Sequence, residues 1–360
     1  MKRRSFIKKS AVASSVFSIV PSHVMGFSGV TPNDKIQLGF IGVGRQGRGL
    51  MTNFVNYDNA AVVAVSDADI KKMAYFTETF QKQLLRKKKA SQQLTEIESY
   101  RELLGRKDID AVVIASPDHW HAQMSVDAAK AGKDIYCEKP LSSSVAEGRA
   151  MVDAARKYQR VFQTGSMQRS WDGFRHGVEL IRNGYIGEIK EINVAVGAPY
   201  KACDLPTQET PDTIDWDAWI GPAPYRGYHM DLACPLEDKR WGQWRDYKPF
   251  RGGMITDWGA HMFDIIQWAL DQDHSGPTVF TPPSSPAESG LTYTYDNGIK
   301  VTHTKWGDGN NEIQFIGSEG RLEVSRSYLK TYPNKALADT PLKDSDTNRV
   351  YKSENHHEDW

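Results

Sequence analysis

The sequence has no apolar run of the roughly 20 residues that a membrane-spanning helix requires, so an integral membrane protein is not expected. It also has no net charge, with 45 lysines and arginines against 45 aspartates and glutamates. The first 30 residues hold five basic and no acidic residues, which leaves 40 basic against 45 acidic residues elsewhere. A nucleic-acid-binding protein is expected to carry a basic face, so this balance argues against that class. The basic run at residues 86–89 indicates a solvated helix face.

Cysteine is scarce, with three residues in 360, and no two of them have the spacing of a metal-binding pair. A metal site is therefore not expected. Cys137 ends an apolar stretch and is interpreted as a small core residue. Cys203 and Cys234 lie in an irregular region and could form a disulfide in an exported protein, a question that the sequence leaves open.

The N-terminal stretch, residues 1–32, has the pattern of an export signal. A basic start precedes a modest apolar run at residues 11–20, and the segment from Arg3 to Lys8 resembles the twin-arginine motif. We expect export to the periplasm or beyond by this route, with the mature fold beginning near Asn33. A disordered basic tail is the alternative, and no clear cleavage site is visible.

A glycine-rich turn organises the region that follows. A predicted strand at residues 36–41 precedes it, and a predicted helix at 46–54 and a second strand at 60–65 follow it. The turn has the pattern G-x-G-x-x-G, formed by Gly42, Gly44 and Gly47. This order predicts a βαβ unit that binds a dinucleotide, with an unliganded structural turn as the alternative.

Each part of this unit has a role in such binding. The first glycine allows the tight turn, the second lets the backbone approach a pyrophosphate, and the third lets helix and strand pack closely. Asp67 lies 20 residues after Gly47, at the end of the second strand, where it can accept hydrogen bonds from ribose hydroxyls. Because a carboxylate repels a 2′-phosphate, NAD is favoured, although Arg45 and Arg48 leave NADP possible.

Strands and helices alternate up to residue 165, which predicts a parallel, doubly wound α/β domain over residues 33–165. Further strands are expected at 111–115, 134–137 and 161–164, and a long helical region at 70–104. Ligands bind at the carboxyl ends of such strands. The side chains that follow these ends are therefore candidates for the cofactor site: Ser116, Pro117, His119, His121, Glu138, Lys139 and Gln168.

The pattern changes in residues 166–360. A helix at 171–182 and a strand at 188–196 precede an aromatic, irregular stretch, and the later segments alternate like antiparallel strands. We predict a second, α+β domain with a large open, mostly antiparallel sheet. Its tryptophans are expected mostly in the core, with one or two as possible stacking platforms for a sugar ring.

Two residue groups suggest acid–base chemistry. Lys139 follows a strand end on the predicted cofactor edge, where burial and nearby positive charge can lower the pKa of its amine. Asp257 and His261 are four residues apart, so in a helix they share one face, and the carboxylate could orient the imidazole or bind a substrate hydroxyl. Asp264 lies on the same side. The alternatives are a surface lysine and a helix with polar residues.

Together these motifs resemble the Gfo/Idh/MocA oxidoreductase family, which includes glucose–fructose oxidoreductase and inositol dehydrogenase. The resemblance runs from about residue 35 to 325 and depends on the phrases GVGRQG, SPDHWH, YCEKP and GGMITDWGAHMFD, with IDWDAWIGPAP, YDNGIKV and FIGSEGRLEV as weaker support. It implies a Rossmann NAD(P)-binding domain, no metal, and assembly into dimers or tetramers through the open sheet. Relatives commonly continue beyond the position of Trp360, so a truncated second domain is expected.

The resemblance also implies residue roles. Lys139 would contact both the nicotinamide ribose and the substrate, His261 would be the general acid/base, and Asp257 and Asp264 would bind substrate hydroxyls. The expected cofactor-binding residues are Gly42, Gly44, Arg45, Gln46, Gly47, Asp67, Ser116, Pro117, His119, His121, Glu138, Lys139 and Gln168. Because twin-arginine export moves folded proteins with their cofactor inside, we expect the NAD to be tightly bound.

The sequence therefore predicts an NAD(P)-dependent dehydrogenase that acts on a hydroxyl of a sugar or polyol. The first alternative is an NAD-dependent glycoside hydrolase, which oxidises the sugar transiently and eliminates the aglycone. The second is a non-catalytic protein that binds a sugar or the cofactor. Neither the sugar, the reacting carbon nor the direction of reaction follows from the sequence.

Overall fold

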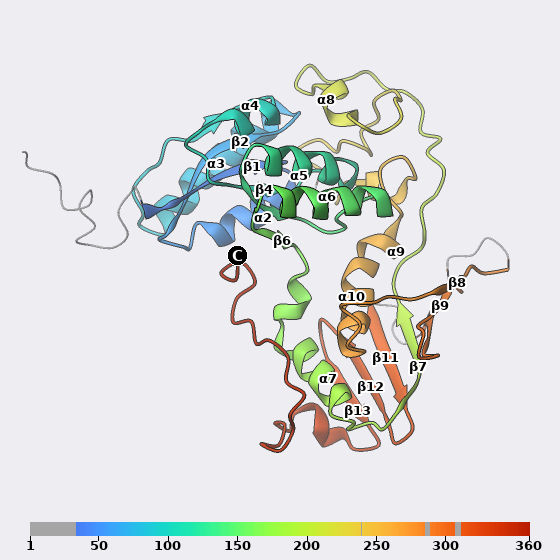
Figure 1. Ribbon diagram of the computed structural model, residues 1–360. Coiled ribbons are helices and arrows are strands. Elements are labelled where there is room, and N and C mark those ends of the chain that lie inside the picture. The colour runs from blue at the N-terminus through green and yellow to red at the C-terminus, as the bar shows by residue number, and fades with distance from the viewer. Residues whose placement is uncertain (1–33, 239, 285–288, 307–310) are drawn as a thin grey trace, which may run out of the picture.

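The computed structural model describes residues 34–238, 240–284, 289–306 and 311–360, and they form two domains, each built on its own sheet (Figure 1). The predicted signal segment, residues 1–32, lies outside the described residues. Within those ranges no helix has both the length and the apolar character needed to cross a membrane. The predicted fold class, a parallel α/β domain followed by one with a mostly antiparallel sheet, is confirmed.

The first sheet has six parallel strands in the order β3-β2-β1-β4-β5-β6. Its strands are β1 (Ile36–Ile41), β2 (Ala60–Ser66), β3 (Thr95–Glu96), β4 (Ala111–Ile114), β5 (Asp134–Cys137) and β6 (Phe162–Thr164). The connecting helices are α2 (Arg45–Phe54), α3 (Ile70–Arg86), α4 (Tyr100–Gly105), α5 (His121–Lys130) and α6 (Val145–Lys157). Because all strands run the same way, their carboxyl ends meet at one edge of the sheet.

The predicted helical region at residues 70–104 is wrong in part. Helix α3 ends at Arg86, Lys88 adopts a left-handed backbone conformation with φ of 56°, and the chain then forms edge strand β3 before α4. The residues between the helices are mostly polar and cannot bury a helix face, so helical packing ends there.

The second sheet has seven strands in the order β13-β12-β11-β7-β10-β9-β8. They are β7 (Ile189–Ala195), β8 (Val279–Thr281), β9 (Thr292–Thr294), β10 (Lys300–His303), β11 (Glu312–Gly317), β12 (Arg321–Ser325) and β13 (Leu329–Tyr332). Strands β10 and β7 pair in parallel and the other described pairs are antiparallel. Helices α7 (Asp172–Arg182) and α10 (Gly259–Ala269) pack on one face of this sheet around an apolar core (Figure 1).

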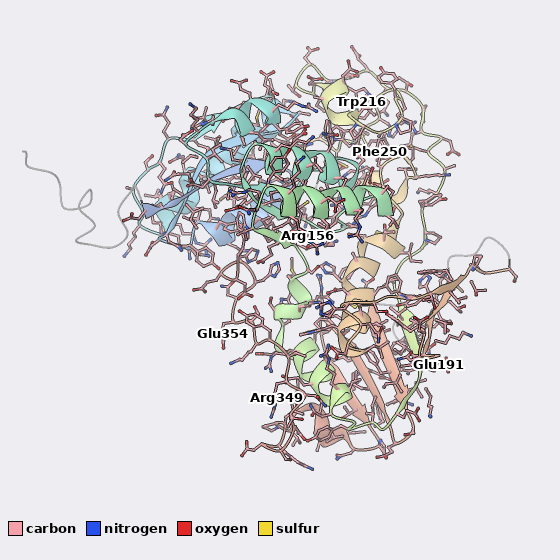
Figure 2. All side chains as sticks on the ribbon, in the orientation of Figure 1. Arg156, Glu191, Trp216, Phe250, Arg349 and Glu354 are labelled. Carbon is pink, nitrogen blue, oxygen red and sulfur yellow. The ribbon has the colours of Figure 1, made fainter. Side chains whose placement is uncertain are left out.

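A long segment between β7 and α9 (Met254–Asp257), residues 196–253, leaves the second domain and packs on the first. This crossover segment contains α8 (Trp216–Ile220), which lies beside the first domain in Figure 1. Main-chain hydrogen bonds hold it there, from the Ile70 amide to the Thr213 carbonyl (3.0 Å) and from the Asp215 amide to the Ala68 carbonyl (2.8 Å). Its own apolar core includes Trp216 and Phe250, both labelled in Figure 2.

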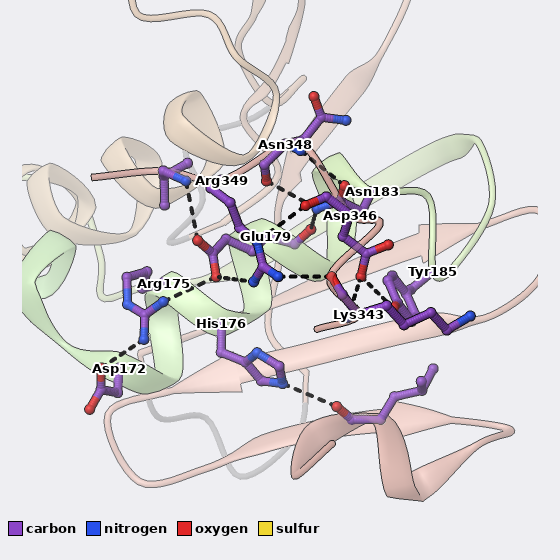
Figure 3. Close-up of polar contacts among 12 residues, drawn as sticks. Asp172, Arg175, His176, Glu179, Asn183, Tyr185, Lys343, Asp346, Asn348 and Arg349 are labelled. Carbon is purple, nitrogen blue, oxygen red and sulfur yellow. Dashed lines mark hydrogen bonds and ion pairs between the residues drawn. The ribbon is translucent and has the colours of Figure 1, made fainter. Parts of the chain in front are cut away.

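The C-terminal stretch, residues 339–360, runs from the second domain back to the first. The buried carboxylate of Glu179 on α7 accepts hydrogen bonds from the Val350 amide (3.2 Å) and from Arg175 (3.1 Å), in the polar network of Figure 3. At the other end, the Trp360 ring packs edge-on against Phe54 and Tyr136 of the first domain. The stretch therefore links the two domains through both polar and aromatic contacts.

The docking of the crossover segment buries an ionisable ring. His119 follows β4, its Nε2 lies 3.0 Å from the Trp219 carbonyl oxygen, and the Phe250 ring packs against it. Burial lowers the pKa of His119 to about 4. At a pH below about 6.5, the ordinary pKa of histidine, the His119 ring of the unfolded chain therefore binds a proton that the folded protein does not bind. The stability that depends on the neutral ring is complete at pH 7 and is lost as the pH falls.

We expect wild-type protein to lose about 2 kcal/mol more stability than His119→Gln between pH 7 and pH 5, because the variant has no ring to protonate. Urea unfolding at the two pH values measures this difference. Burial also raises the pKa of Asp118 to about 7, so this carboxyl adds stability to the folded protein as the pH falls. Because Asp118 is present in both proteins, its contribution cancels in the comparison. The control is Phe250→Leu, which loosens the same contact without removing a titrating group and should lower stability equally at both pH values. Equal slopes for wild type and His119→Gln would contradict the prediction.

Candidate functional site

A cleft of about 840 Å³ lies at the carboxyl edge of the first sheet, where the crossover segment and the start of α10 close over it. This volume is in the range of small-molecule and cofactor sites. The described chain contributes to its walls from the glycine turn, from the ends of β2, β4 and β5, from residues 232–236, 238 and 240–246 of the crossover segment, and from the region of Asp257 and His261.

The glycine turn fits a bound pyrophosphate. A Cβ atom on Gly42, whose φ is +82°, would come within 2.4 Å of the Ser116 amide nitrogen, and one on Gly47 would come within 2.3 Å of the Gly42 carbonyl oxygen. By contrast, apart from its two chain neighbours, no atom of the described residues lies within 4 Å of the Cβ position at Gly44, which lines the cleft. The first and third glycines thus allow close packing and the second leaves room for a ligand at the N-terminus of α2.

Asp67 lies at the end of β2 in the wall of the cleft. One carboxylate oxygen accepts from the Val43 amide (2.8 Å) and the other from the Asp69 amide (3.0 Å). Each oxygen retains a second lone pair, so the carboxylate is oriented by the backbone and can still accept from ribose hydroxyls. Arg48 donates to the Val43 carbonyl (3.2 Å) and lies over the Tyr75 ring.

A buried charge network forms the other end of the cleft. The Lys139 amine contacts a carboxylate oxygen of Asp257, and Arg251 approaches the same oxygen at 2.5 Å. Through its Nε, Arg251 also lies 2.6 Å from Asp118, which follows β4. The Arg251 side chain is 2% exposed, so this network is shielded from water. It connects β4 and β5 of the first domain to α9 of the second.

The network sets the protonation states of its members. Burial alone would raise the pKa of Asp257, but the charges of Arg251 and Lys139 outweigh it and lower that pKa to about 2. Burial lowers the pKa of Lys139, Arg251 lowers it further, and Asp257 opposes both. The site therefore holds an ionised carboxylate beside an amine that releases its proton more readily than an ordinary lysine.

His261 lies in the first turn of α10 and lines the same cleft. Its Nδ1 is buried and has no hydrogen-bond partner in the described structure. Burial, together with the positive charges of Lys139 and Arg326, lowers the pKa of this ring to about 2, so the imidazole is neutral at pH 7. Because Asp257 is bound to Lys139 and Arg251, it does not hold the His261 ring. An orphaned ring nitrogen at this position suits a hydrogen bond with a substrate hydroxyl.

Most of the predicted site residues meet around this cleft. Those that line it are Gly42, Gly44, Arg45, Gln46, Asp67, Ser116, Pro117, His121, Glu138, Lys139, Asp257 and His261. Gln46 donates to the Glu138 carboxylate (2.8 Å), and the two ring nitrogens of His121 face the carbonyls of Pro140 and Ser116. Burial lowers the pKa of His121 to about 4, so the neutral ring donates to one of these carbonyls at a time.

Four predicted residues lie elsewhere. Gly47 packs against Gly42, and His119 contacts Trp219. Gln168 is buried and its side-chain oxygen accepts from Arg326 (2.8 Å). Arg169 donates two hydrogen bonds to the Asp264 carboxylate (2.8 and 2.7 Å). The two residues meet because this face of α10 packs against η3 (Met167–Ser170). None of the four lines the cleft as described.

Sequence reasoning missed several cleft residues: Asp118, Arg245, Arg251 and Arg326. Asp118 stands inside the SPDHWH phrase and Arg251 directly precedes the Gly252-Gly253 pair, so both were close to a recognised motif. Arg326 follows an ordinary antiparallel strand and carries no sequence signal. Only the folded chain shows that it reaches the cleft.

Three further expectations concern the cysteines, a metal site and the tryptophans. Cys203 and Cys234 are both free thiols. Over the ranges that the structure describes, no three His, Cys, Asp or Glu side chains gather as a metal site would require. Among the tryptophans of the second domain, Trp216, Trp219 and Trp244 are buried, whereas Trp241 is 45% exposed and lies under the guanidinium of Arg45 at 4.7 Å.

Similarity to known proteins agrees with this geometry. Residues 36–166 match a family described as "Oxidoreductase family, NAD-binding Rossmann fold", designated GFO_IDH_MocA, and residues 197–353 match its C-terminal alpha/beta domain. The oxidoreductase YrbE of Bacillus subtilis (strain 168) is 33% identical over 301 residues, which are 81% of this chain and 71% of that protein. A glycosyl hydrolase family 109 protein of Shewanella pealeana is 33% identical over 153 residues, 42% of this chain, and the match spans only 31% of that relative's length.

Solved structures show the same fold. The WlbA dehydrogenase from Bordetella pertussis, in complex with NADH and UDP-GlcNAcA, superimposes with a TM-score of 0.55 at 18% identity, over 81% of this chain and 78% of that one. The scyllo-inositol dehydrogenase of Lactobacillus casei, with NAD(H) and scyllo-inositol, gives a TM-score of 0.53 at 17% identity, over 82% and 77%. Both family domains and the long match to YrbE cover most of the sequence. The chain therefore belongs to the Gfo/Idh/MocA family of NAD-binding oxidoreductases.

Proposed function

We propose that this protein oxidises or reduces a hydroxyl-bearing carbon of a sugar or polyol, with NAD as the preferred cofactor. One observation carries the proposal: Lys139 and the unpartnered ring nitrogen of His261 line the same cleft as the glycine turn. Relatives in this fold bind UDP-GlcNAcA and scyllo-inositol, both of which carry several hydroxyl groups. The position of Asp67 favours NAD, because a 2′-phosphate beside its carboxylate would be repelled.

The residues divide the proton chemistry between them. Bound nicotinamide supplies the hydride acceptor or donor. The Lys139 amine, whose pKa is lowered by burial and by Arg251, takes the hydroxyl proton as the carbon is oxidised, or returns it on reduction. The neutral His261 ring holds the hydroxyl through its Nδ1, and Asp257 fixes the position of the Lys139 amine.

Replacing Lys139 tests this assignment. Lys139→Ala removes the group that transfers the proton, so we expect kcat for the oxidised sugar to fall by about 10²- to 10⁴-fold while the cofactor stays bound. Steady-state reduction of NAD measures the rate. Lys130→Ala, on the exposed end of α5, is the control and should retain full activity. Unchanged activity in Lys139→Ala would instead favour a protein that binds a sugar or the cofactor without catalysis.

Cofactor retention is the second test. We propose that residues 1–32 direct twin-arginine export and that NAD leaves the cytoplasm inside the folded protein. Protein purified without added cofactor should then release about one NAD(H) per chain on denaturation, detected by absorbance and mass, with little NADP(H). An empty protein that binds NAD weakly would point to an ordinary dehydrogenase and argue against export with bound cofactor.

A second candidate function is glycoside hydrolysis through transient oxidation. It is favoured by the match to an alpha-N-acetylgalactosaminidase of Shewanella oneidensis, 35% identical over 127 residues, which are 35% of this chain and 27% of that protein. The hydride would return to the sugar after elimination of the aglycone. Release of the aglycone from a nitrophenyl glycoside with no net NADH would support this route, whereas accumulation of NADH with free sugar would support the dehydrogenase.

A further inference from the structure

Arg326 is a cation of the cleft with no carboxylate of the described chain within ion-pair distance of it. It follows β12 and lines the end of the cleft that also holds Lys139, Asp257 and His261. Lys139 and Arg251 at this end are both bound to Asp257. Arg326 has no such partner among the ion pairs of the described residues, and it is exposed to solvent.

Three neighbours hold the Arg326 guanidinium in one orientation. It lies over the Trp258 ring at 4.2 Å and over the Trp171 ring at 5.1 Å, and its Nε donates to the Gln168 side-chain oxygen at 2.8 Å. Gln168 is itself buried, so this acceptor is fixed in place. With two aromatic rings against the guanidinium and Nε bound, the two terminal amino groups remain to donate, side by side, to a planar or tetrahedral anion.

Arg326 lies close enough to His261 for one substrate to contact both side chains. Trp258, which Arg326 covers, packs edge-on against His261 with 6.0 Å between ring centroids. Arg245 also lacks an ion pair in the described structure, but it lies over the Trp244 ring at 4.2 Å and over the Trp241 ring at 5.1 Å, and it donates to the Gly242 carbonyl (3.2 Å). Trp241 is also covered by Arg45 of the glycine turn. Arg245 is therefore assigned to the phosphates of the cofactor, and Arg326 to the substrate.

From this arrangement we propose that the substrate carries an anionic oxygen group, a carboxylate or a phosphate, and that Arg326 binds it. The substrate class is then an acidic sugar, such as a uronic acid, rather than a neutral polyol. This inference depends on the proposed function for the identity of the ligand as a sugar. Burial lowers the pKa of the Arg326 guanidinium, and the charges of Asp257 and Glu138 oppose this shift.

Calorimetric titration of the full-length protein with its bound cofactor tests the proposal. The ligands are D-glucuronate with D-glucose, D-galacturonate with D-galactose, and D-glucose 6-phosphate. We expect at least one acidic ligand to bind about 10- to 100-fold more tightly than its neutral partner, because a hydrogen-bonded charge pair contributes that much to affinity. A uronate preference identifies a carboxylate, and preference for the phosphate ester identifies a phosphate. Acidic ligands that bind no more tightly than neutral ones would overturn the proposal.

Substitution assigns any preference to this side chain. Arg326→Gln should remove the preference for the acidic ligand and leave the affinity for the neutral sugar unchanged, and Arg326→Lys should restore part of it. Arg321→Gln is the matched control, since Arg321 lies at the other end of β12, is exposed, and pairs with Glu323 at 3.1 Å. If Arg326→Gln weakened both ligands equally, the residue would have a structural role between the two tryptophans and the proposal would fail.

Oxidation of the same ligands separates this inference from the proposed function. An acidic ligand that binds through Arg326 but never reduces the bound NAD would leave the anion site in place and contradict the dehydrogenase. Neutral sugars oxidised as fast as acids, with no effect of Arg326→Gln, would support the dehydrogenase and reject the anion site.

Discussion

The contact of Arg251 with two carboxylates holds the candidate site together. Asp118 belongs to the first domain and Asp257 to the second, and Arg251 lies 2.6 Å from the first and 2.5 Å from the second. Removal of Arg251 would take from both buried acids the cation that they share. The same carboxylate of Asp257 positions Lys139. The geometry of Lys139 and Asp257 therefore depends on the two domains being in register.

The sequence predicted the first domain well because its signals are local. Strand β1 and the glycines after it follow from the apolar alternation and from the turn that Gly42 alone permits, with its φ of +82°. The position of Lys139 at the cofactor edge followed from the strand end that precedes it. These are features that a short window of sequence contains.

What could not be predicted is mostly contact between distant segments. Asp264 was expected on substrate from its spacing to His261, but Arg169, almost a hundred residues earlier, holds its carboxylate. Arg326 reaches the cleft because its side chain lies beside Gln168 of η3 and the Trp258 ring, and no pattern within β12 shows this. The error in predicting one helical region at residues 70–104 had a different cause. Local polarity alone did not show that β3 would form at the sheet edge.

The crossover segment has a consequence for how ligands enter. In the described chain, the polypeptide passes between the two domains at the end of β6, twice through the crossover segment, and again in the C-terminal stretch. Four connections of this kind oppose a simple hinge, because rotation about one of them would strain the others. Main-chain hydrogen bonds at Ala68 and Ile70 would have to break for the cover over the glycine turn to lift. Lifting this cover therefore requires local unfolding of the crossover segment rather than a rotation of one domain against the other.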